Sequence, residues 1–140
     1  MTSAQATGGS GSDTLRNFEN LNGSQYGDKL TGGNGADKFV FANFLDSGTS
    51  KGDLDKILDL RRGEGDKIDL SQIDANTNRR GDQAFTFIGQ AEYAHRPGEL
   101  GFTIFGDDII IGGDTNGDGE SDFLIVVQDL SLLKQTDFIL

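Results

Sequence analysis

The sequence predicts an all-β protein in which a short parallel β-roll leads into a β-sandwich. Two observations support this prediction: a nine-residue repeat near the start of the chain, and several short β-type segments after residue 38. No stretch longer than a single turn shows the 3.6-residue apolar period of a helix. We expect the roll over residues 8–45 and the sandwich over 46–140, with residues 1–7 either a tail or foreign to the native chain.

The repeat has the pattern GGxGxDxUx, where U is a large apolar residue. It occurs without a fault at residues 8–16 and 32–40, and a third copy at 23–31 has Tyr26 where a glycine belongs. In all three copies the aspartate stands two residues before U, a regularity that a flexible Gly/Ser linker would not show. This pattern is typical of a calcium-binding parallel β-roll, in which each repeat forms half a coil.

The residues between the first two copies indicate a slip in phase. Counting back nine residues from Leu30 leads to Leu21, which is out of phase with Leu15. The roll is therefore expected to be irregular at its start. Because a repeat cannot bury its apolar residue alone and roughly three or more are needed for a stable stack, we expect the roll to lean on the domain that follows.

The repeats offer hard oxygen ligands for a metal ion. Glycines permit the positive φ of a tight turn whose carbonyls point inward, and the aspartates add charge. Such ligands suit calcium, whereas the absence of cysteine and the single His95 argue against zinc and other soft-ligand metals. The predicted calcium ligands in the roll are the carboxylates of Asp13, Asp28 and Asp37 and the carbonyls of Gly9, Gly11, Gly33 and Gly35. The interval from Asp13 to Asp37 is longer than one two-repeat coil. The sequence therefore leaves open whether Asp13 is a calcium ligand.

A second acidic segment, DTNGDGESD at residues 114–122, copies the first part of an EF-hand loop. Asp114, Asn116, Asp118 and Asp122 occupy the first, third, fifth and ninth places, but the twelfth holds an isoleucine instead of the bidentate glutamate. Two interpretations stay open. The loop is either a weak calcium site or a hairpin turn, since Asn-Gly and Asp-Gly are both strong turn dipeptides.

Composition excludes several classes of function. With 23 acidic against 12 basic residues and a formal charge of −11, the chain would repel nucleic acid. No stretch reaches the roughly 20 apolar residues of a membrane span, and the N-terminus lacks the pattern of a cleaved secretory signal. A metalloprotease HExxH motif is absent, and the acidic clusters fall in Gly-rich turns or beside lysines, so we expect a non-catalytic chain.

The order of segments resembles the C-terminal domain of serralysin-type metalloproteases and related RTX exoproteins. The resemblance runs from Gly8 to Leu140 through DKFVF, LDKILDL, GDKIDLS, GELGFTIFG, GDTNGDGESDFLI and the terminal DFIL. It implies a calcium-bound roll and sandwich at the end of a larger secreted protein, where the domain serves folding and export through a type I secretion ABC transporter complex. It also implies that Asp46 and Asp55 complete a calcium site where the roll meets the sandwich, a site that Asp66 could join. Otherwise we expect Asp59, Asp66 and Asp69 to make turn and lysine contacts.

The resemblance also implies that the tail is an uncleaved export signal, formed by Asp137, Phe138, Ile139 and Leu140. The alternative for these residues is a last β-strand packed on the sandwich, and both can hold if a transporter reads the unfolded chain. We therefore expect an extracellular bacterial domain that folds on binding calcium and is attached to an N-terminal functional domain. The alternative function is a module that binds an anionic polysaccharide or a surface, like the RTX repeats of alginate epimerases and adhesins. That function would need a groove that gathers basic residues, namely Arg61, Arg62, Lys67, Arg79, Arg80 and Arg96.

Overall fold

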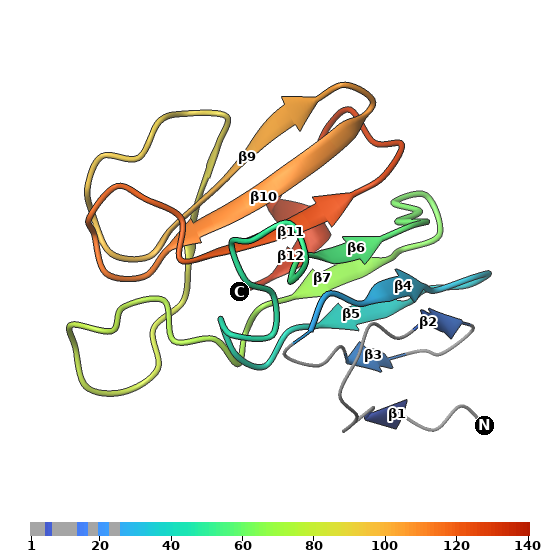
Figure 1. Cartoon of the computed structure of the whole chain (residues 1–140), viewed down its shortest axis with the longest axis horizontal. Helices are drawn as coiled ribbons and strands as arrows, with labels where there is room; N and C mark the ends of the chain where they lie inside the picture. Colours follow the sequence, from blue (N-terminus) through green and yellow to red (C-terminus); the bar gives the residue numbers. More distant parts are fainter. Residues whose placement is uncertain (1–4, 7–13, 17–19, 23–25) are drawn as a thin grey trace.

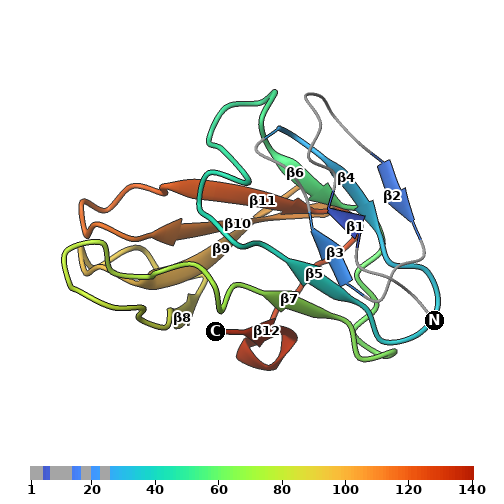
Figure 2. The same ribbon diagram turned by 90° about the horizontal axis from the view of Figure 1, so that it is seen from below.

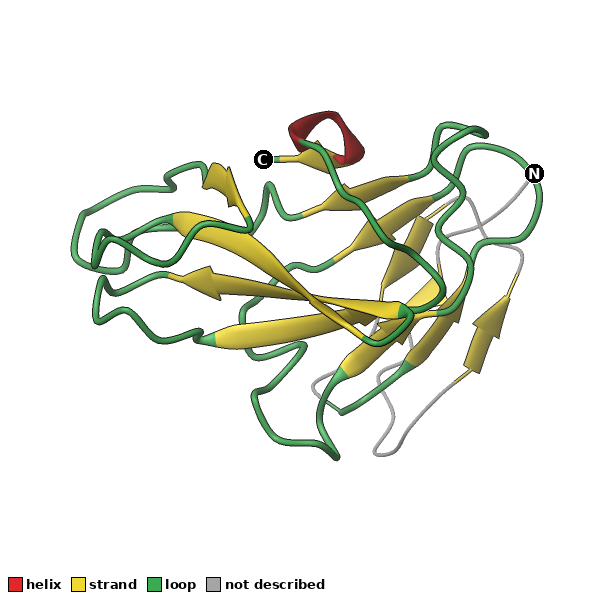
Figure 3. Ribbon diagram, turned by 90° about the horizontal axis from the view of Figure 1, so that it is seen from above, coloured by secondary structure: helices red, strands yellow, loops and turns green. Residues whose placement is uncertain are grey.

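The computed structural model describes residues 5–6, 14–16, 20–22 and 26–140, with side chains from Tyr26 onward. Within these residues the chain forms two β-sheets and one short 3₁₀ helix, η1 (Gln135–Asp137) (Figure 1, Figure 3). The hydrophobic core contains side chains from strands of both sheets. The prediction of an all-β fold with a parallel roll is confirmed.

The smaller sheet is parallel across all its described strands. Pairing aligns Leu21 with Phe39, Phe39 with Ile68, and Ile68 with Phe138, so an apolar residue holds the same register position in four neighbouring strands. The order is β1 (Gln5–Ala6), β3 (Asn20–Asn22), β5 (Lys38–Val40), β7 (Lys67–Asp69) and β12 (Phe138–Ile139). The C-terminal strand thus forms the last described edge of this sheet.

The larger sheet changes from parallel to mainly antiparallel pairing. Leu15, Leu30 and Ile57 are in register in its parallel part, and β11 continues that part by pairing in parallel with β6. The order is β2 (Thr14–Arg16), β4 (Lys29–Thr31), β6 (Asp55–Ile57), β11 (Phe123–Val127), β10 (Asp108–Asp114), β9 (Glu99–Phe105) and β8 (Thr86–Gly89). Antiparallel pairing begins between β11 and β10 and continues between β10 and β9.

Between residues 14 and 69 the described strands alternate between the two sheets, which is the winding of a β-roll (Figure 2). The registers of Leu15 with Leu30 and of Leu21 with Phe39 agree with the phase slip that the sequence predicts. Strands β6 and β7, from LDKILDL and GDKIDLS, continue the winding. The parallel part of the fold therefore extends past residue 45, where the sequence placed the start of the sandwich.

The core consists of apolar side chains from the strands of both sheets. Phe39, Phe41 and Phe123 are its largest fully buried side chains, and the Phe123 ring packs edge-on against Phe85 with ring centroids 5.8 Å apart. Since the roll and the antiparallel strands contribute to one continuous cluster, they fold around a shared core. The expectation that the short roll leans on the following strands agrees with this packing.

Candidate metal centre

The same three-residue unit of aspartate, lysine and a large apolar residue stands at the start of four strands of the roll, with the aspartate either the first residue of the strand or the one directly before it. These units are Asp28-Lys29-Leu30, Asp37-Lys38-Phe39, Asp55-Lys56-Ile57 and Asp66-Lys67-Ile68. The apolar residue of each unit is fully buried in the core. Because β4 lies beside β6 and β5 beside β7, the aspartates come together in two pairs, Asp28 with Asp55 and Asp37 with Asp66.

The first acidic group, which we call the Asp55 cluster, consists of Asp28, Asp46 and Asp55. The Asp28 main-chain N–H donates to Oδ1 of Asp55 at 2.7 Å, and the Asp55 N–H donates to the Ser47 hydroxyl at 3.0 Å. Asp46 accepts two main-chain N–H groups of its own loop, from Ala42 and Asn43. The resemblance implied a site completed by Asp46 and Asp55, and the structure brings these two residues close to Asp28.

The Asp55 carboxyl is poorly suited to carry a charge in this environment. Burial, and then the charges of Asp28 and Asp46, raise the pKa of Asp55 to about 8, although the hydrogen bond from Asp28 acts in the opposite direction. Its Oδ2 atom is buried without a hydrogen-bond partner. Burial also raises the pKa of Asp46. A cation beside Oδ2 would remove both penalties at once.

The second group, the Asp37 cluster, consists of Asp37, Asp59, Glu64 and Asp66. Asp66 accepts the Asp37 N–H at 2.9 Å, and Glu64 accepts the N–H of Gly35 at 2.6 Å. Asp59 accepts the N–H groups at positions 32 and 33 at 2.8 and 2.9 Å. Three carboxylates from the later turn therefore surround the glycine turn of the last perfect repeat.

Within this group the Asp37 carboxyl is the one without full compensation. Burial, followed by the charges of Asp66, Asp59 and Glu64, raises the pKa of Asp37 to about 6, while the charge of Arg61 lowers it. Its Oδ2 atom is buried and has no hydrogen-bond partner. The same atom would lie 2.5 Å from a Cβ at position 32, so Gly32 makes room for the carboxylate. Asp37 and Asp55 thus present the same feature on opposite sheets of the roll.

The predicted glycine ligands have the expected backbone where the structure describes them. Gly33 and Gly35 have φ values of 98° and 104°, and the Gly33 carbonyl accepts a hydrogen bond from Nη1 of Arg61 at 2.6 Å. The predicted ligands Gly9, Gly11 and Asp13 lie outside the described residues.

Sequence reasoning did not anticipate all the contacts that the acids of the Asp37 cluster make. Asp66 was expected either in a turn contact or at the site of Asp46 and Asp55. It makes the turn contact, accepting the Arg61 N–H at 2.7 Å on Oδ2, and its Oδ1 also accepts the Asp37 N–H. Glu64 was not singled out, and Asp59 was expected only in local contacts. The repeated Asp-Lys-apolar unit is a signal that could have found the pairing, because it identifies both LDKILDL and GDKIDLS as strands of the roll.

The donor chemistry of both clusters fits calcium. In the part of the chain that the structure describes, no three His, Asp or Glu side chains already converge as a complete metal site. The two buried Oδ2 atoms nevertheless lack partners, and each lies among further carboxylate oxygens that carry like charge. Hard anionic oxygens in a glycine-rich turn are the ligands that calcium prefers.

The loop at 114–122 uses its carboxylates for its own backbone. Both oxygens of Asp114 accept main-chain N–H groups, from Asn116 and Gly117 on Oδ1 and from Gly119 on Oδ2. Asp122 accepts the N–H of residue 115 at 2.7 Å and the side-chain amide of residue 116 at 2.9 Å, and Asp118 accepts the N–H of residue 120 at 2.8 Å. These are the contacts of the hairpin turn that joins β10 to β11, which was one of the two interpretations of this sequence.

The predicted export signal is folded as a strand. Asp137 is 5% exposed, and its Oδ2 accepts a hydrogen bond from Nε of Arg62 at 2.8 Å. The next residue, Phe138, pairs in register with Ile68 of β7. The ring of Phe138 lies 5.3 Å from that of Phe87, measured between centroids. The strand alternative for the tail is therefore the conformation in the folded state, whereas its role in export is a separate matter.

Three of the basic residues in the predicted groove are engaged in contacts within the fold. Arg61 bonds to the Gly33 carbonyl and to Asn34, Arg62 pairs with Asp137, and Lys67 donates to the carbonyl of Thr136. Arg79, Arg80 and Arg96 are exposed. Among the described residues, no helix has the length and apolar character that crossing a bilayer requires.

Comparison with known proteins places the fold and the family. The structure is similar to two solved subunits of the Azotobacter vinelandii mannuronan C5-epimerase. One is AlgE6R3, at 22% identity and a TM-score of 0.60, with 94% of this chain and 70% of that chain covered. The other is AlgE6R2, at 25% identity and a TM-score of 0.57, with 86% and 69% covered. A comparison with curated protein sequences gives no match. All of residues 1–140 match the family described as Peptidase M10 serralysin C terminal, and the chain therefore belongs to the serralysin C-terminal family.

Proposed function

We propose that this chain is a calcium-dependent folding domain of a larger secreted protein, and that calcium binding to the Asp55 and Asp37 clusters drives folding of the roll. The observation that carries the proposal is the pair of buried Oδ2 atoms, on Asp55 and Asp37, that lack hydrogen-bond partners. Asp55 is the first residue of β6 and Asp37 directly precedes β5, and both carboxylates have further acids nearby.

Calcium would supply positive charge beside the two Oδ2 atoms that have no hydrogen-bond partner. The residues available to hold it are Asp28, Asp46 and Asp55 in one cluster, and Asp37, Asp59, Glu64 and Asp66 with the turn carbonyls in the other. Without a cation, the chain's formal charge of −11 and the buried carboxylates oppose compaction. An ion present at about 100 times its dissociation constant adds about 2.7 kcal/mol per site to the free energy of unfolding. Two such sites would supply much of the roughly 5–15 kcal/mol of a typical domain.

The family membership supports a role in export. Calcium is scarce inside a bacterium and abundant outside, so a chain that needs the ion would stay loose until it leaves the cell. We propose that the terminal residues 137–140 are read by a type I ABC transporter complex while the chain is unfolded. Outside, the same residues become strand β12. Catalysis would belong to an attached N-terminal domain, and the chain itself would be a non-catalytic part of the secreted protein.

A calcium titration tests the folding proposal. The chelator-treated chain is followed by circular dichroism and dye fluorescence as calcium is added, with magnesium as the control ion. We expect a cooperative gain of β signal with calcium alone. Asp55→Asn and Asp37→Asn should each reduce the response, whereas Asp107→Asn, on an exposed turn, should leave it unchanged. A fully folded calcium-free chain that ignores calcium would overturn the proposal.

Export is tested separately with the full chain and a chain that lacks residues 137–140, each produced together with a type I transporter. We expect the truncated chain to remain inside the cell while the full chain reaches the medium. Equal amounts of both chains in the medium would remove the export role but not the calcium-dependent folding.

A polysaccharide-binding module is the second candidate, favoured by the likeness to the epimerase subunits. The net charge and the internal contacts of Arg61 and Arg62 weigh against an anionic glycan. Retention of the folded chain on immobilised alginate tests this function directly. Loss of retention on replacing Arg79, Arg80 and Arg96 together would support it, and passage of the unmodified chain without delay would exclude it.

A further inference from the structure

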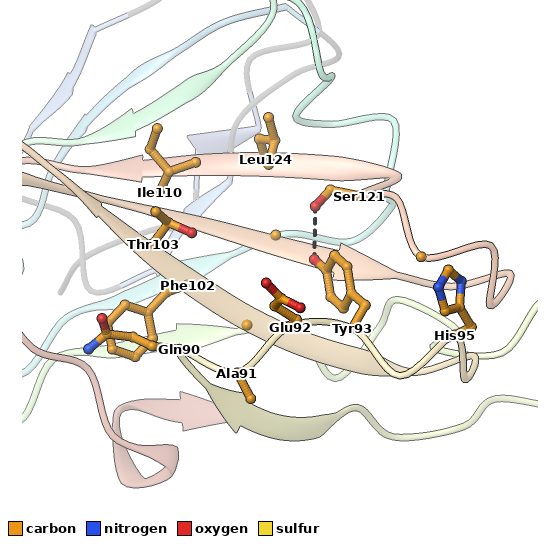
Figure 4. Close-up of a pocket in the computed structure, with 13 residues that line it drawn as sticks. Gln90, Ala91, Glu92, Tyr93, His95, Phe102, Thr103, Ile110, Ser121 and Leu124 are labelled. Atoms are coloured by element: carbon orange, nitrogen blue, oxygen red, sulfur yellow. Dashed lines mark hydrogen bonds between the residues drawn. The ribbon is translucent and has the colours of Figure 1, made fainter.

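The antiparallel part of the larger sheet carries a cleft of about 450 Å³, which we call the Tyr93 cleft (Figure 4). Its floor is the face of the sheet that points away from the core. In β9 and β10 the core residues are Leu100, Phe102, Ile109 and Ile111. The alternate residues Gly101, Thr103, Ile110 and Gly112 line the cleft, to which Phe102 also contributes. This alternation follows the two-residue period of a strand. Residues 90–93 and His95 form a wall beside that floor.

Gly112 leaves room on the floor of the cleft for the side chains of Tyr93 and Ser121. The Tyr93 hydroxyl lies 2.8 Å from Oγ of Ser121, and the two meet over Gly112. A Cβ at position 112 would overlap Ser121 Oγ and lie 2.8 Å from the Tyr93 hydroxyl. A side chain at this position would therefore push the two hydroxyls apart and fill the cleft.

The wall is held in place by contacts of its own. Oε2 of the buried Glu99 accepts the main-chain N–H of Ala94 at 2.7 Å, and Nδ1 of His95 lies 2.9 Å from the Asp118 carbonyl. His95 adopts a φ of 59°, which is uncommon for a residue other than glycine. Its ring occupies the space that a side chain at Gly119 would need. These contacts form the cleft before any ligand enters, and binding would need little rearrangement.

The lining combines apolar surface with groups that both donate and accept hydrogen bonds. Ile110 and Leu124 provide apolar surface on the floor, while Thr103, Ser121 and Tyr93 provide hydroxyls. The side chains of residues 90 and 92 add an amide and a carboxylate (Figure 4). The volume is in the range of about 300–1,000 Å³ that small-molecule sites occupy. A sugar ring fits this mixture, because its C–H face packs on apolar side chains and its hydroxyls bond in either direction.

The charges around the cleft select against an anion. Burial raises the pKa of Tyr93, and the negative charges of Asp114, Asp122 and Glu99 raise it further, while the hydrogen bond with Ser121 lowers it. Three carboxylates therefore act on the hydroxyl that lines the cleft. Glu92 adds a further carboxylate to the lining. Uronates and other anionic sugars would enter against this field.

We propose that the Tyr93 cleft binds an uncharged carbohydrate unit. This site is separate from the calcium clusters, and none of the calcium ligands proposed above lines it. It also makes a different prediction from the anionic polysaccharide that the sequence suggested, because charge excludes uronates while the hydroxyl and amide groups recognise neutral sugars.

The test is an NMR titration of the full chain in calcium-containing buffer, after circular dichroism has shown that it is folded. Maltose, cellobiose and N,N′-diacetylchitobiose are the neutral probes, and a mannuronate disaccharide is the anionic one. We expect saturable shifts of the Gly101 and Gly112 amide signals with at least one neutral probe, and at least roughly tenfold weaker binding of the uronate. No saturable shift with any neutral probe, or tighter binding of the uronate, would overturn the proposal.

Two pairs of variants separate recognition from structure. Tyr93→Phe removes only a hydroxyl and should weaken binding of the neutral probe by about 2- to 10-fold. Tyr26→Phe, in the roll and outside the lining, should leave this binding unchanged. Glu92→Gln removes the charge of an exposed lining residue. It should reduce the difference in affinity between the uronate and the neutral sugar. Glu120→Gln, exposed and outside the lining, is its control. The proposal would be contradicted if Glu92→Gln left the difference in affinity between uronate and neutral sugar unchanged. It would also be contradicted if the two tyrosine variants changed the affinity for the neutral probe equally.

Discussion

The main-chain N–H of Asp28 donates a 2.7 Å hydrogen bond to Oδ1 of Asp55, across 27 residues of sequence. The bond joins the starts of two neighbouring strands in the larger sheet. It satisfies one oxygen of the Asp55 carboxylate and leaves Oδ2 buried without a partner. A ligand that fills this position would therefore tie two coils of the roll together.

Replacing Asp55 by asparagine should separate the hydrogen bond from the charge. The asparagine Oδ1 can still accept the Asp28 N–H, but the buried charge and the calcium ligand are gone. We expect higher stability than the unmodified chain in chelator at pH 8, and lower stability in calcium. The calcium-dependent gain should shrink by about 2.7 kcal/mol when the ion is at about 100 times its dissociation constant. Urea denaturation with and without chelator measures both values, and an unchanged calcium gain would contradict the assignment.

The calcium-free chain should lose stability as the pH rises from 5 to 8. The pKa values of Asp37 and Asp55, about 6 and about 8 in the folded chain, exceed the ordinary value near 4 expected when unfolded. The folded state therefore binds more protons in this window, and its free energy of unfolding falls with each step up in pH. Thermal melts in chelator across this range measure the slope. The double variant Asp37→Asn with Asp55→Asn should flatten it, and a melting temperature that climbs with pH would refute the explanation.

Gly32→Ala should damage the Asp37 cluster through sterics alone. A Cβ at this position would lie 2.5 Å from Oδ2 of Asp37, so the carboxylate would have to leave its place. We expect a loss of about 1–3 kcal/mol in calcium and a weaker calcium response. Gly52→Ala is the matched control, because a Cβ there has no atom within 4 Å. Calcium titrations that coincide for the two alanine variants would show that the Gly32 turn is not part of the site.

Arg62→Ala should loosen the C-terminal strand. It removes the 2.8 Å ion pair to Asp137, a carboxylate that is otherwise buried and accepts the N–H of Lys134. The expected cost is about 1–3 kcal/mol, and hydrogen exchange should accelerate first in β12. Arg79→Ala, on an exposed loop, should change stability by about 0.5 kcal/mol or less. If the amides of β12 were equally protected from hydrogen exchange in both variants, strand pairing alone would hold the tail in place.

Much of the architecture could be predicted from residues in a fixed period. The nonapeptide repeat predicts which residue of each strand faces inward, and Leu21 and Phe39 are in register as the repeat requires, even across the slip in phase. The glycine turn at Gly33 and Gly35 also follows from local sequence, since glycine adopts positive φ without strain. The family assignment rests on the same kind of ordered pattern and covers the whole chain.

Only the tertiary structure decided which acids meet. Asp37 and Asp66 are 29 residues apart and Asp28 and Asp55 are 27 apart, because loops of unequal length separate the later strands. No fixed period connects such residues, and the pairing of neighbouring strands brings them together. The Tyr93 cleft arises in the same way, since Tyr93 and Ser121 belong to segments that meet only when the antiparallel strands are formed. Local sequence thus determined the strands and their inward faces, while the packing of distant segments determined the acidic clusters and the cleft.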